Sequence, residues 1–422
     1  MKKIILLILV VVAIYFGYTK FIKNNEIIPP KFIYEDILVN TNRKQTTIDT
    51  FTIYGKYLNL KGTIPSEEGT YTLVFKNNDI EEIINTQIDG STFYTSKYIN
   101  DGINLEKLKT GNYIIMLHNT TTDSYYNLIN KTEYHDNKYY TITKNNKNNL
   151  ITFKEENFNN INYWTINVKE EKLPSEVYDI VIDPGHGGVD TGAGNGRYNE
   201  STFTLDYAKT LTEVLEEDGL KVKLTREEDK QIDHYGEGSR TGIPYETKAK
   251  LMLSLHLNSS GYKVQKGVEI YYAYQANNDY AKTLADNIKT YANEPYSNNP
   301  QNKVLDGVYM RVYSKENIAA LAKEAKRDGY EPYILGSDET YYYFIRETGG
   351  IMTKAFSDGR NPKYKENIYR NYNQGTEAYL CELAYISNSD DLKNIINNKD
   401  GYIKALKTSI LSYAEIAMKD EE

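Results

Sequence analysis

The pattern of apolar residues changes at Leu173–Glu176 (LPSE), and this change constrains the fold more than any other feature of the chain. After it, strand-like runs alternate with helical ones, at residues 178–182, 202–217, 221–224, 251–257, 268–272 and 279–291. Alternation of this kind is typical of an α/β domain with a largely parallel sheet. We therefore predict such a domain in residues 174–422.

Residues 24–173 show a different pattern. Short alternating or β-rich runs, such as Thr70–Lys76 and Tyr163–Val168, are separated by turns rich in Asn, Gly and Asp, without a convincing helical stretch. This pattern predicts an all-β, sandwich-like domain. A chain of 422 residues is long enough for two such domains.

The N-terminus carries a hydrophobic segment. Met1-Lys2-Lys3 precede an apolar run that is shorter than the ~20 residues of a usual spanning helix, and no small-residue cleavage site follows it. We predict a hydrophobic helix that acts as an uncleaved signal anchor in residues 1–23. It would bind the membrane and hold the protein on the extracellular side of the cytoplasmic membrane. The alternative is a cleaved signal peptide and a secreted protein.

Charge and cysteine content exclude some classes of protein. The net charge is −8, and no cluster of Lys and Arg stands out, so we do not expect nucleic acid as a partner. The single cysteine, Cys381, excludes an intramolecular disulfide and a cysteine-type zinc site. The sequence makes no prediction of the oligomeric state.

Polar side chains of catalytic character follow or interrupt the predicted strands. His186 and His256 belong to two of these strand ends, Glu382 to a late apolar strand, and Glu200 begins a helix. Carboxyl ends of parallel strands meet at one edge of a sheet, and two histidines with a carboxylate are typical ligands of catalytic zinc. A further carboxylate suits a general base. The alternatives are a phosphate-binding glycine loop, whose G-K-[ST] ending is missing, and a core histidine at His256.

Several motifs occur in a defined order: VIDPGHGGVDTGA (Val181–Ala193), Asn199-Glu200, KVKLTREED (Lys221–Asp229), SLHLN (Ser254–Asn258), GVEIYY (Gly267–Tyr272) and CELAYISN (Cys381–Asn388). With them, residues from about 178 to 416 resemble the zinc-dependent N-acetylmuramoyl-L-alanine amidases of the type 3 catalytic family. These enzymes cut the amide bond between the lactyl group of muramic acid and L-alanine in peptidoglycan.

The resemblance implies roles for particular residues. His186, Glu200 and His256 would bind Zn²⁺, and Glu382 would be the catalytic carboxylate. The resemblance also implies a twisted, mostly parallel sheet flanked by helices. Zinc-bound histidines usually donate their second N–H to an oxygen, so Asp183, Asp190 and Asn258 are candidates to accept that hydrogen bond. Asn258 is also a candidate for substrate binding.

The chain between His256 and Glu382 is longer than compact members of this family need. We predict an insertion at about residues 295–375, which is either an elaborated surface loop or the wall of a substrate groove. In the second case Arg346 or Arg360 would pair with a carboxylate of the stem peptide.

The resulting hypothesis is a membrane-anchored zinc amidase that binds and hydrolyses peptidoglycan in cell-wall remodelling or lysis. One alternative is another zinc amide hydrolase or peptidase of the cell wall. The other is a catalytically inactive scaffold that binds the wall, although all four candidate residues are present. The β-rich domain would serve as a spacer or would bind wall polymers.

Overall fold

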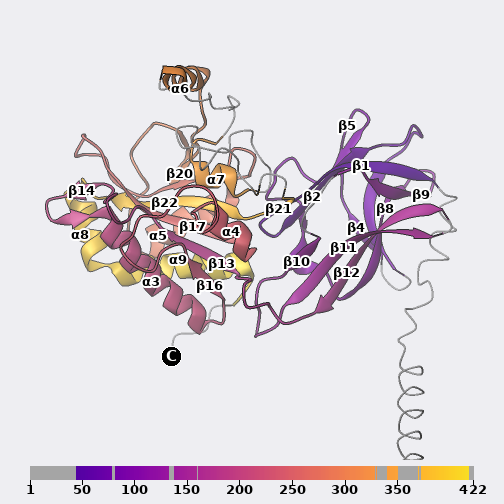
Figure 1. The fold of residues 1–422 in the computed structure, drawn as a ribbon, viewed down its shortest axis with the longest axis horizontal. Coiled ribbons are helices and arrows are strands. Elements are labelled where there is room, and N and C mark those ends of the chain that lie inside the picture. The colour runs from indigo at the N-terminus through magenta and orange to yellow at the C-terminus, as the bar shows by residue number, and fades with distance from the viewer. Residues whose placement is uncertain are drawn as a thin grey trace, which may run out of the picture.

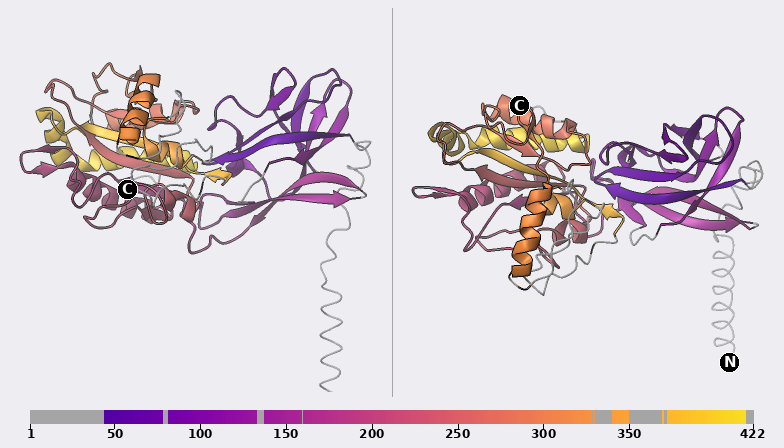
Figure 2. Two further views of the ribbon diagram at one scale, coloured as in Figure 1. Left: turned by 45° about the horizontal axis from the view of Figure 1, so that its top comes forward. Right: turned by 90° about the horizontal axis from the view of Figure 1, so that it is seen from above.

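The computed structural model describes residues 44–77, 81–132, 137–158, 160–327, 329, 340–349, 369 and 372–417. An all-β domain and an α/β domain lie side by side (Figure 1; two further views in Figure 2). The predicted signal anchor, residues 1–23, and Arg360 lie outside the described residues. Within the described part of the chain, no helix has the length and apolar character needed to cross a bilayer.

The first domain is built from strands in one continuous hydrogen-bonded network. Thirteen of the described strands belong to it, twelve from this domain and β21 (Gln374–Gly375) from the other. The twelve are β1 (Gln45–Tyr54), β2 (Tyr57–Thr63), β3 (Tyr71–Lys76), β4 (Glu81–Ile84), β5 (Gln87–Asp89), β6 (Thr92–Tyr94), β7 (Ile103–Asn104), β8 (Gly111–Asn119), β9 (Ser124–Asn130), β10 (Lys138–Tyr140), β11 (Asn149–Phe158) and β12 (Ile161–Glu170), with the short 3-10 helix η1 (Leu105–Lys107) between β7 and β8.

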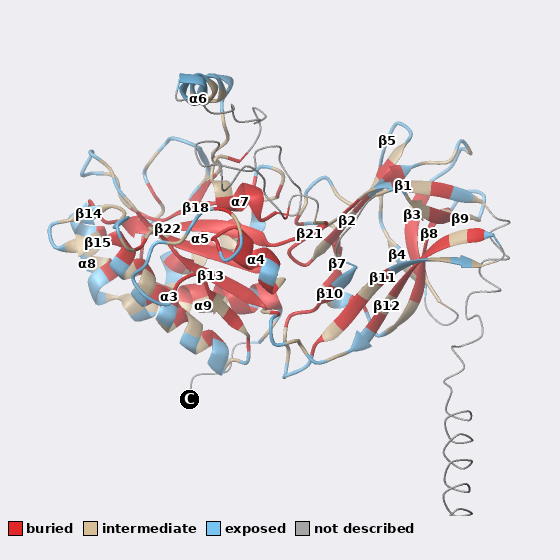
Figure 3. Cartoon of the chain, in the orientation of Figure 1, coloured by how far each residue is buried: buried red, intermediate tan, exposed pale blue. Residues whose placement is uncertain are grey.

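Alternating side chains from these strands fill one core. Strand β1 buries Ile48, Phe51 and Ile53 while intervening residues face outward. Buried and outward-facing residues alternate along these strands (Figure 3). Within the core, Phe51 packs edge-on against Trp164, with ring centroids 4.8 Å apart. The period of two in the sequence therefore produces the all-β domain.

The second domain contains a seven-stranded sheet of mostly parallel strands, as the α/β pattern predicts. Its order is β16-β13-β17-β22-β18-β20-β19. The strands are β13 (Ile180–Pro184), β16 (Val222–Leu224), β17 (Leu251–Asn258), β18 (Glu269–Tyr271), β19 (Lys303–Leu305), β20 (Val308–Tyr309) and β22 (Glu377–Tyr385), and a small hairpin adds β14 (Gly194–Asn195) and β15 (Tyr198–Asn199). The helices are α3 (Glu200–Glu217), α4 (Gly242–Thr247), α5 (Asp279–Tyr291), α6 (Lys315–Arg327), α7 (Tyr343–Glu347), α8 (Ser389–Asn397) and α9 (Lys399–Ala414).

The central strands are buried on both faces. Helices α3 and α5 pack on the sheet, with α9 in contact with both. Tyr207, Leu211 and Leu215 form the buried stripe of α3, because they recur every four residues, close to the helical period of 3.6. Strands β13, β17 and β22 run parallel, so their carboxyl ends reach the same edge of the sheet. Strand β18 instead runs antiparallel to β22, which places Glu269 directly opposite Glu382.

The two domains share a polar interface at the opposite edge of this sheet. Strand β21 pairs with β1, and buried ionisable residues stand at or just before the starts of β13, β17 and β22, namely Asp179, Lys250 and Glu377. Asn100 of the first domain donates to Glu377 Oε1 at 3.2 Å and accepts a hydrogen bond from the amide of Asn277 at 2.7 Å. The β domain therefore contacts the amino-terminal ends of the strands that carry the candidate site residues.

A buried carboxyl pair joins the segment after α5 to α8. Glu294 Oε2 accepts hydrogen bonds from Tyr402 and Asn394, while Asp391 Oδ2 accepts the backbone N–H groups of Gly267 and Tyr385. Burial and then the charge of Asp391 raise the pKa of Glu294 to about 7. Below that pH Glu294 is protonated, so the two carboxyls avoid mutual repulsion.

Candidate active site

The glycine loop after β13 sets the position of His186. His186 has a φ of 60°, in the left-handed region, which costs a non-glycine residue roughly 1–2 kcal/mol. The buried Arg240 guanidinium holds this turn, because it donates to the carbonyl oxygens of Pro184 and His186. It also pairs with the carboxylate of Asp183. The loop therefore presents the His186 imidazole in a fixed orientation at the carboxyl end of the sheet.

Three residues predicted to bind metal lie together at this edge. His186 Nε2 is 3.2 Å and His256 Nδ1 is 2.9 Å from Glu200 Oε1. One potential ligand atom from each residue lies within 4.8 Å of the others, so the described residues contain a group that can hold a metal ion. Two imidazole nitrogens and one carboxylate match the donor set of catalytic zinc.

Two glycines leave room for these side chains. A Cβ atom on Gly185 would lie 2.4 Å from Cε1 of His256, and one on Gly192 would lie 2.6 Å from both Glu200 Oε2 and His186 Cδ2. Any larger residue at either position would displace a candidate ligand. The loop composition is therefore explained by the close packing of the three ligand side chains.

Glu200 is held as a carboxylate. The backbone N–H groups of Ala193 and Leu257 donate to its Oε2 and Oε1 at 2.8 and 2.9 Å. Burial opposes its ionisation, but the hydrogen bonds and charges of His186 and His256 outweigh burial and lower the Glu200 pKa. An ionised carboxylate is the form that binds a metal.

Asp190 and Asp183 occupy different places. Asp190 Oδ2 lies 2.8 Å from His186 Nδ1. This is the contact predicted for an oxygen that orients a metal-binding histidine. Asp183 is buried and accepts hydrogen bonds from Ser254, Thr225 and Arg240. Burial opposes ionisation of Asp183, but the charge of Arg240 and these hydrogen bonds lower its pKa. Asp183 thus anchors the loop through Arg240.

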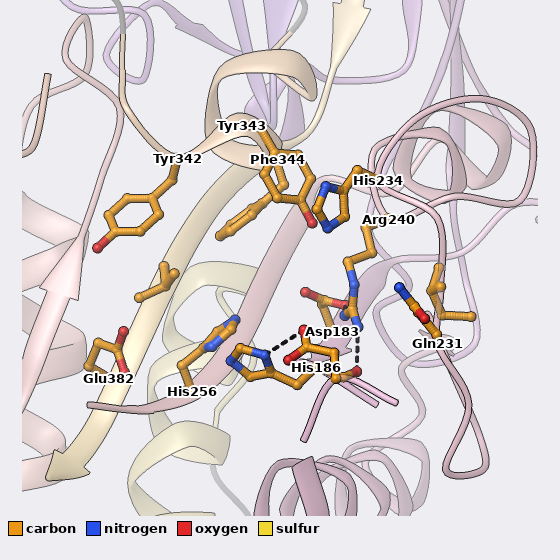
Figure 4. A pocket seen from close by; sticks show the side chains of 13 residues that line it. Asp183, His186, Gln231, His234, Arg240, His256, Tyr342, Tyr343, Phe344 and Glu382 are labelled. Atoms are coloured by element: carbon orange, nitrogen blue, oxygen red, sulfur yellow. Dashed lines mark hydrogen bonds and ion pairs between the residues drawn. The ribbon is translucent and has the colours of Figure 1, made fainter. Parts of the chain in front are cut away.

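Glu382 projects from β22 beside His256 of β17, its partner in the strand register (Figure 4). Its side chain is partly exposed, and its Oε2 is shielded from solvent without a hydrogen-bond partner in the described part of the chain. Burial of the carboxyl, and then the charges of Glu200 and Glu269, raise the Glu382 pKa well above its usual range. A carboxyl of raised pKa that lines a pocket is suited to proton transfer.

Two residues predicted to bind substrate are engaged inside the protein. Asn258 donates to Glu269 Oε2 at 3.0 Å and accepts from the Ser259 amide at 2.8 Å. Arg346 is buried, and its Nε pairs with Glu347 at 2.8 Å, so the predicted pairing with a stem-peptide carboxylate needs correction. Arg346 Nη1 donates to the carbonyl oxygens of Thr340 and Tyr341, so this side chain is engaged in contacts within its own segment.

A pocket of about 370 Å³ opens over strands β13, β17 and β22 (Figure 4). The residues that line it are Asp183, His186, Asp190, Gln231, Ile232, His234, Arg240, His256, Tyr342, Tyr343, Phe344, Leu380 and Glu382. His186, His256 and Glu382 lie on one side, and Tyr342, Tyr343 and Phe344 lie on the other (Figure 4).

Sequence reasoning missed several of these residues. Asp183 ends a buried strand, and a buried carboxylate needs a cation as partner, so the sequence does predict a partner such as Arg240. Glu269 lies between Val268 and Ile270 in an apolar strand, the same signal that singled out Glu382. No local signal identifies His234 or Tyr342 as pocket residues, since their placement depends on the tertiary fold.

The fold and the site together define an α/β protein with a candidate His–Glu–His metal centre and an adjacent proton-transfer carboxyl. Residues 180–326 match the family described as N-acetylmuramoyl-L-alanine amidase. This match confirms the resemblance predicted from the motifs over that stretch. Glu382 and the three aromatic residues of the pocket, Tyr342, Tyr343 and Phe344, lie after residue 326 and so outside the matched stretch.

Individual relatives agree with the family match. The chain is 31% identical over 153 residues to the germination-specific N-acetylmuramoyl-L-alanine amidase of Bacillus subtilis, covering 33% of this chain and 62% of that protein. It is 33% identical over 122 residues to the probable cell wall amidase LytH of Staphylococcus aureus, covering 28% of this chain and 38% of that protein. The chain thus spans less than two thirds of the length of these curated relatives.

Solved structures of similar proteins include the catalytic domain of CwlV, an N-acetylmuramoyl-L-alanine amidase from Bacillus (Paenibacillus) polymyxa var. colistinus. The sequence identity is 20% and the TM-score is 0.36, with 57% of this chain and all of that chain (100%) covered. Cwp6 from Clostridium difficile is 26% identical with a TM-score of 0.36, covering 56% of this chain and 28% of that chain.

Proposed function

We propose that this protein is a zinc-dependent N-acetylmuramoyl-L-alanine amidase that hydrolyses the amide bond between the lactyl group of muramic acid and L-alanine in peptidoglycan. The observation that carries the proposal is the convergence of His186, Glu200 and His256 beside Glu382, whose Oε2 has no hydrogen-bond partner among the described residues. This constellation begins within the stretch that matches the amidase family.

His186, Glu200 and His256 would hold the zinc ion. Bound zinc lowers the pKa of a coordinated water to about 7 and polarises a carbonyl group. The chain supplies the rest of the arrangement. Asp190, through its contact with Nδ1 of His186, fixes the tautomer that leaves Nε2 free to bind the metal.

Glu382 performs the proton transfers. Its carboxylate takes a proton from the attacking water and then gives it to the leaving nitrogen of L-alanine, a role typically worth about a hundredfold to ten-thousandfold in rate. Its Oε2 has no hydrogen-bond partner among the described residues, so it is available to accept a proton. Its position in register with His256 places the base next to the proposed metal.

We further propose that residues 1–23 anchor the protein in the cytoplasmic membrane, with both folded domains on the outer side. The basic residues before the apolar run and the missing cleavage signal support this. The β domain, fixed to the catalytic domain through Asn100 and β21, would act as a spacer between the membrane and the wall.

The experiment is hydrolysis of purified peptidoglycan by the zinc-loaded full chain, with Glu382→Gln as the matched control. We expect stem peptides with a free alanine amino terminus in the wild-type reaction and none with the variant. Cleavage within the peptide would favour a cell-wall peptidase instead. No products from a zinc-loaded wild type that binds peptidoglycan would favour an inactive scaffold.

A further inference from the structure

A wall of aromatic side chains closes the pocket opposite the candidate metal ligands. Tyr342, Tyr343 and Phe344 lie across the pocket from His186 and His256 (Figure 4). These aromatic residues follow the stretch that matches the amidase family, which ends at residue 326. The wall lies within residues 295–375, the stretch predicted to be an insertion.

The segment that carries the wall is held by buried polar contacts. Nη1 of Arg346 donates to the carbonyl oxygens of Thr340 and Tyr341 at 2.8 and 3.1 Å, and its Nε pairs with Glu347. The Tyr245 hydroxyl donates to the Glu347 carbonyl at 2.8 Å. Arg346 thus organises the turn that precedes α7, so the aromatic rings are presented from a fixed backbone.

The rings themselves are also fixed by their neighbours. Tyr342 packs edge-on against Tyr271, with ring centroids 4.9 Å apart, and remains partly exposed in the pocket. Tyr343 is covered by the His234 ring, which stacks on it at 4.4 Å. Tyr342 therefore offers an ordered aromatic surface to a bound molecule, at little cost in conformational entropy.

The described side chains that line the pocket argue against an acidic ligand beside this wall. Arg240 is the one Lys or Arg among the described lining residues, and its guanidinium already binds Asp183, Pro184 and His186. The Arg311 guanidinium, which interacts with Tyr342, stacks on the Tyr341 ring and does not line the pocket. A carboxylate of the stem peptide would therefore find no unpaired Lys or Arg among the described lining residues. It would also meet the acidic side chain of Asp190.

An uncharged sugar ring suits the same surface. Its C–H faces pack on an aromatic ring, and its hydroxyl and acetamido groups can hydrogen-bond to Gln231 and His234, which line the pocket. A pocket of about 370 Å³ is in the range that holds a small ligand.

We propose that Tyr342 is a specificity-determining residue that packs against the N-acetylated sugar ring on the muramoyl side of the scissile amide. This inference rests on the proposed amidase function. It assigns the aromatic wall to recognition of the glycan rather than of the acidic peptide.

The test compares two substrates with the same peptide and the same scissile bond. One is N-acetylmuramoyl-L-alanyl peptide, and the other is the D-lactoyl-L-alanyl peptide, which lacks the sugar. We expect Tyr342→Leu to lower kcat/KM on the first substrate by about threefold to tenfold, the value of one aromatic contact, and to leave the second unchanged. Tyr342→Phe, which keeps the ring, should retain the wild-type preference.

Tyr262→Leu is the matched control. The Tyr262 side chain is exposed and is not among the described residues that line the pocket. The ratio of the two kcat/KM values should stay at the wild-type level in this variant. Melting temperature and bound zinc are measured in each variant, so that loss of folding is not mistaken for loss of recognition.

Equal losses on both substrates in folded Tyr342→Leu would overturn the sugar contact while leaving the amidase function standing. Failure of the zinc-loaded wild type to cleave either substrate would overturn the amidase function, and the sugar contact with it. If Tyr342→Leu does not fold, saturation-transfer NMR on the wild type with free N-acetylmuramic acid decides. Transfer to the ring protons of the sugar supports the contact, and its absence overturns it.

Discussion

Replacing Gly185 by alanine tests the packing of the metal site with one added methyl group. The new Cβ would lie 2.4 Å from Cε1 and 2.6 Å from Nε2 of His256, whereas carbon atoms in contact normally stay about 3.5 Å apart. The imidazole must therefore retreat by about 1 Å. Gly185 has no left-handed φ, so the substitution adds no backbone strain of that kind.

We expect Gly185→Ala to weaken zinc binding by about tenfold to a hundredfold and to lower kcat/KM by about a hundredfold, because misplacing one ligand by this distance spoils both metal and reaction geometry. Competition with a chromophoric zinc chelator measures the affinity. The matched control is Gly261→Ala, whose Cβ would have no atom within 4 Å. Zinc affinity and activity within twofold of wild type in folded Gly185→Ala would refute the reasoning.

Three further predictions concern stability. Removing zinc with a chelator should lower the free energy of unfolding by about 4 kcal/mol when free zinc had exceeded its Kd by about a thousandfold. In His186→Ala, the chelator should lower the free energy of unfolding much less than in the wild type. An equal decrease in the variant would show that the metal binds elsewhere. Because the folded-state pKa of Glu294 is raised to about 7 from 4.5, wild-type stability should fall as the pH rises between these values. Glu294→Gln mimics the protonated carboxyl, so its stability should depend less on pH. Above pH 7 this variant should be more stable than the wild type by on the order of 1–3 kcal/mol, measured by denaturant titration. An unchanged dependence of stability on pH in the variant would contradict this prediction. Asn100→Ala should cost about 1–3 kcal/mol because it removes hydrogen bonds from Glu377 and Asn277, and exposed Asn157→Ala should cost far less; equal melting temperatures for the two variants would contradict this.

Much of the catalytic domain is predictable from local patterns. The helical run at residues 279–291 is α5 in the structure, and the strand expected at 178–182 is β13, shifted by two residues. The rule that parallel strands end at one edge is enough to bring His186 and His256 together. The site followed from the sequence because its ligands lie at, or directly after, recognisable element boundaries.

Other features depend on the tertiary fold. The direction of β18 is not encoded in its short apolar run, yet the antiparallel pairing is what sets Glu269 opposite Glu382. The sequence predicted that Arg346 could bind substrate. In the structure α7 packs on β22, and Arg346 is buried there and pairs with Glu347. The local sequence does not encode this packing. For the same reason, the aromatic run around Tyr342 could not be assigned to a pocket from the sequence.

The most direct test of the central claim is hydrolysis of a muropeptide in heavy-oxygen water by the zinc-loaded full chain, with fragment masses read by mass spectrometry. The account predicts that the heavy oxygen enters the lactyl carboxylate of the muramic acid product, and that L-alanine gains a free amino group. Label in a peptide carboxylate or at a sugar carbon would contradict the assignment of His186, Glu200, His256 and Glu382 to an N-acetylmuramoyl-L-alanine amidase.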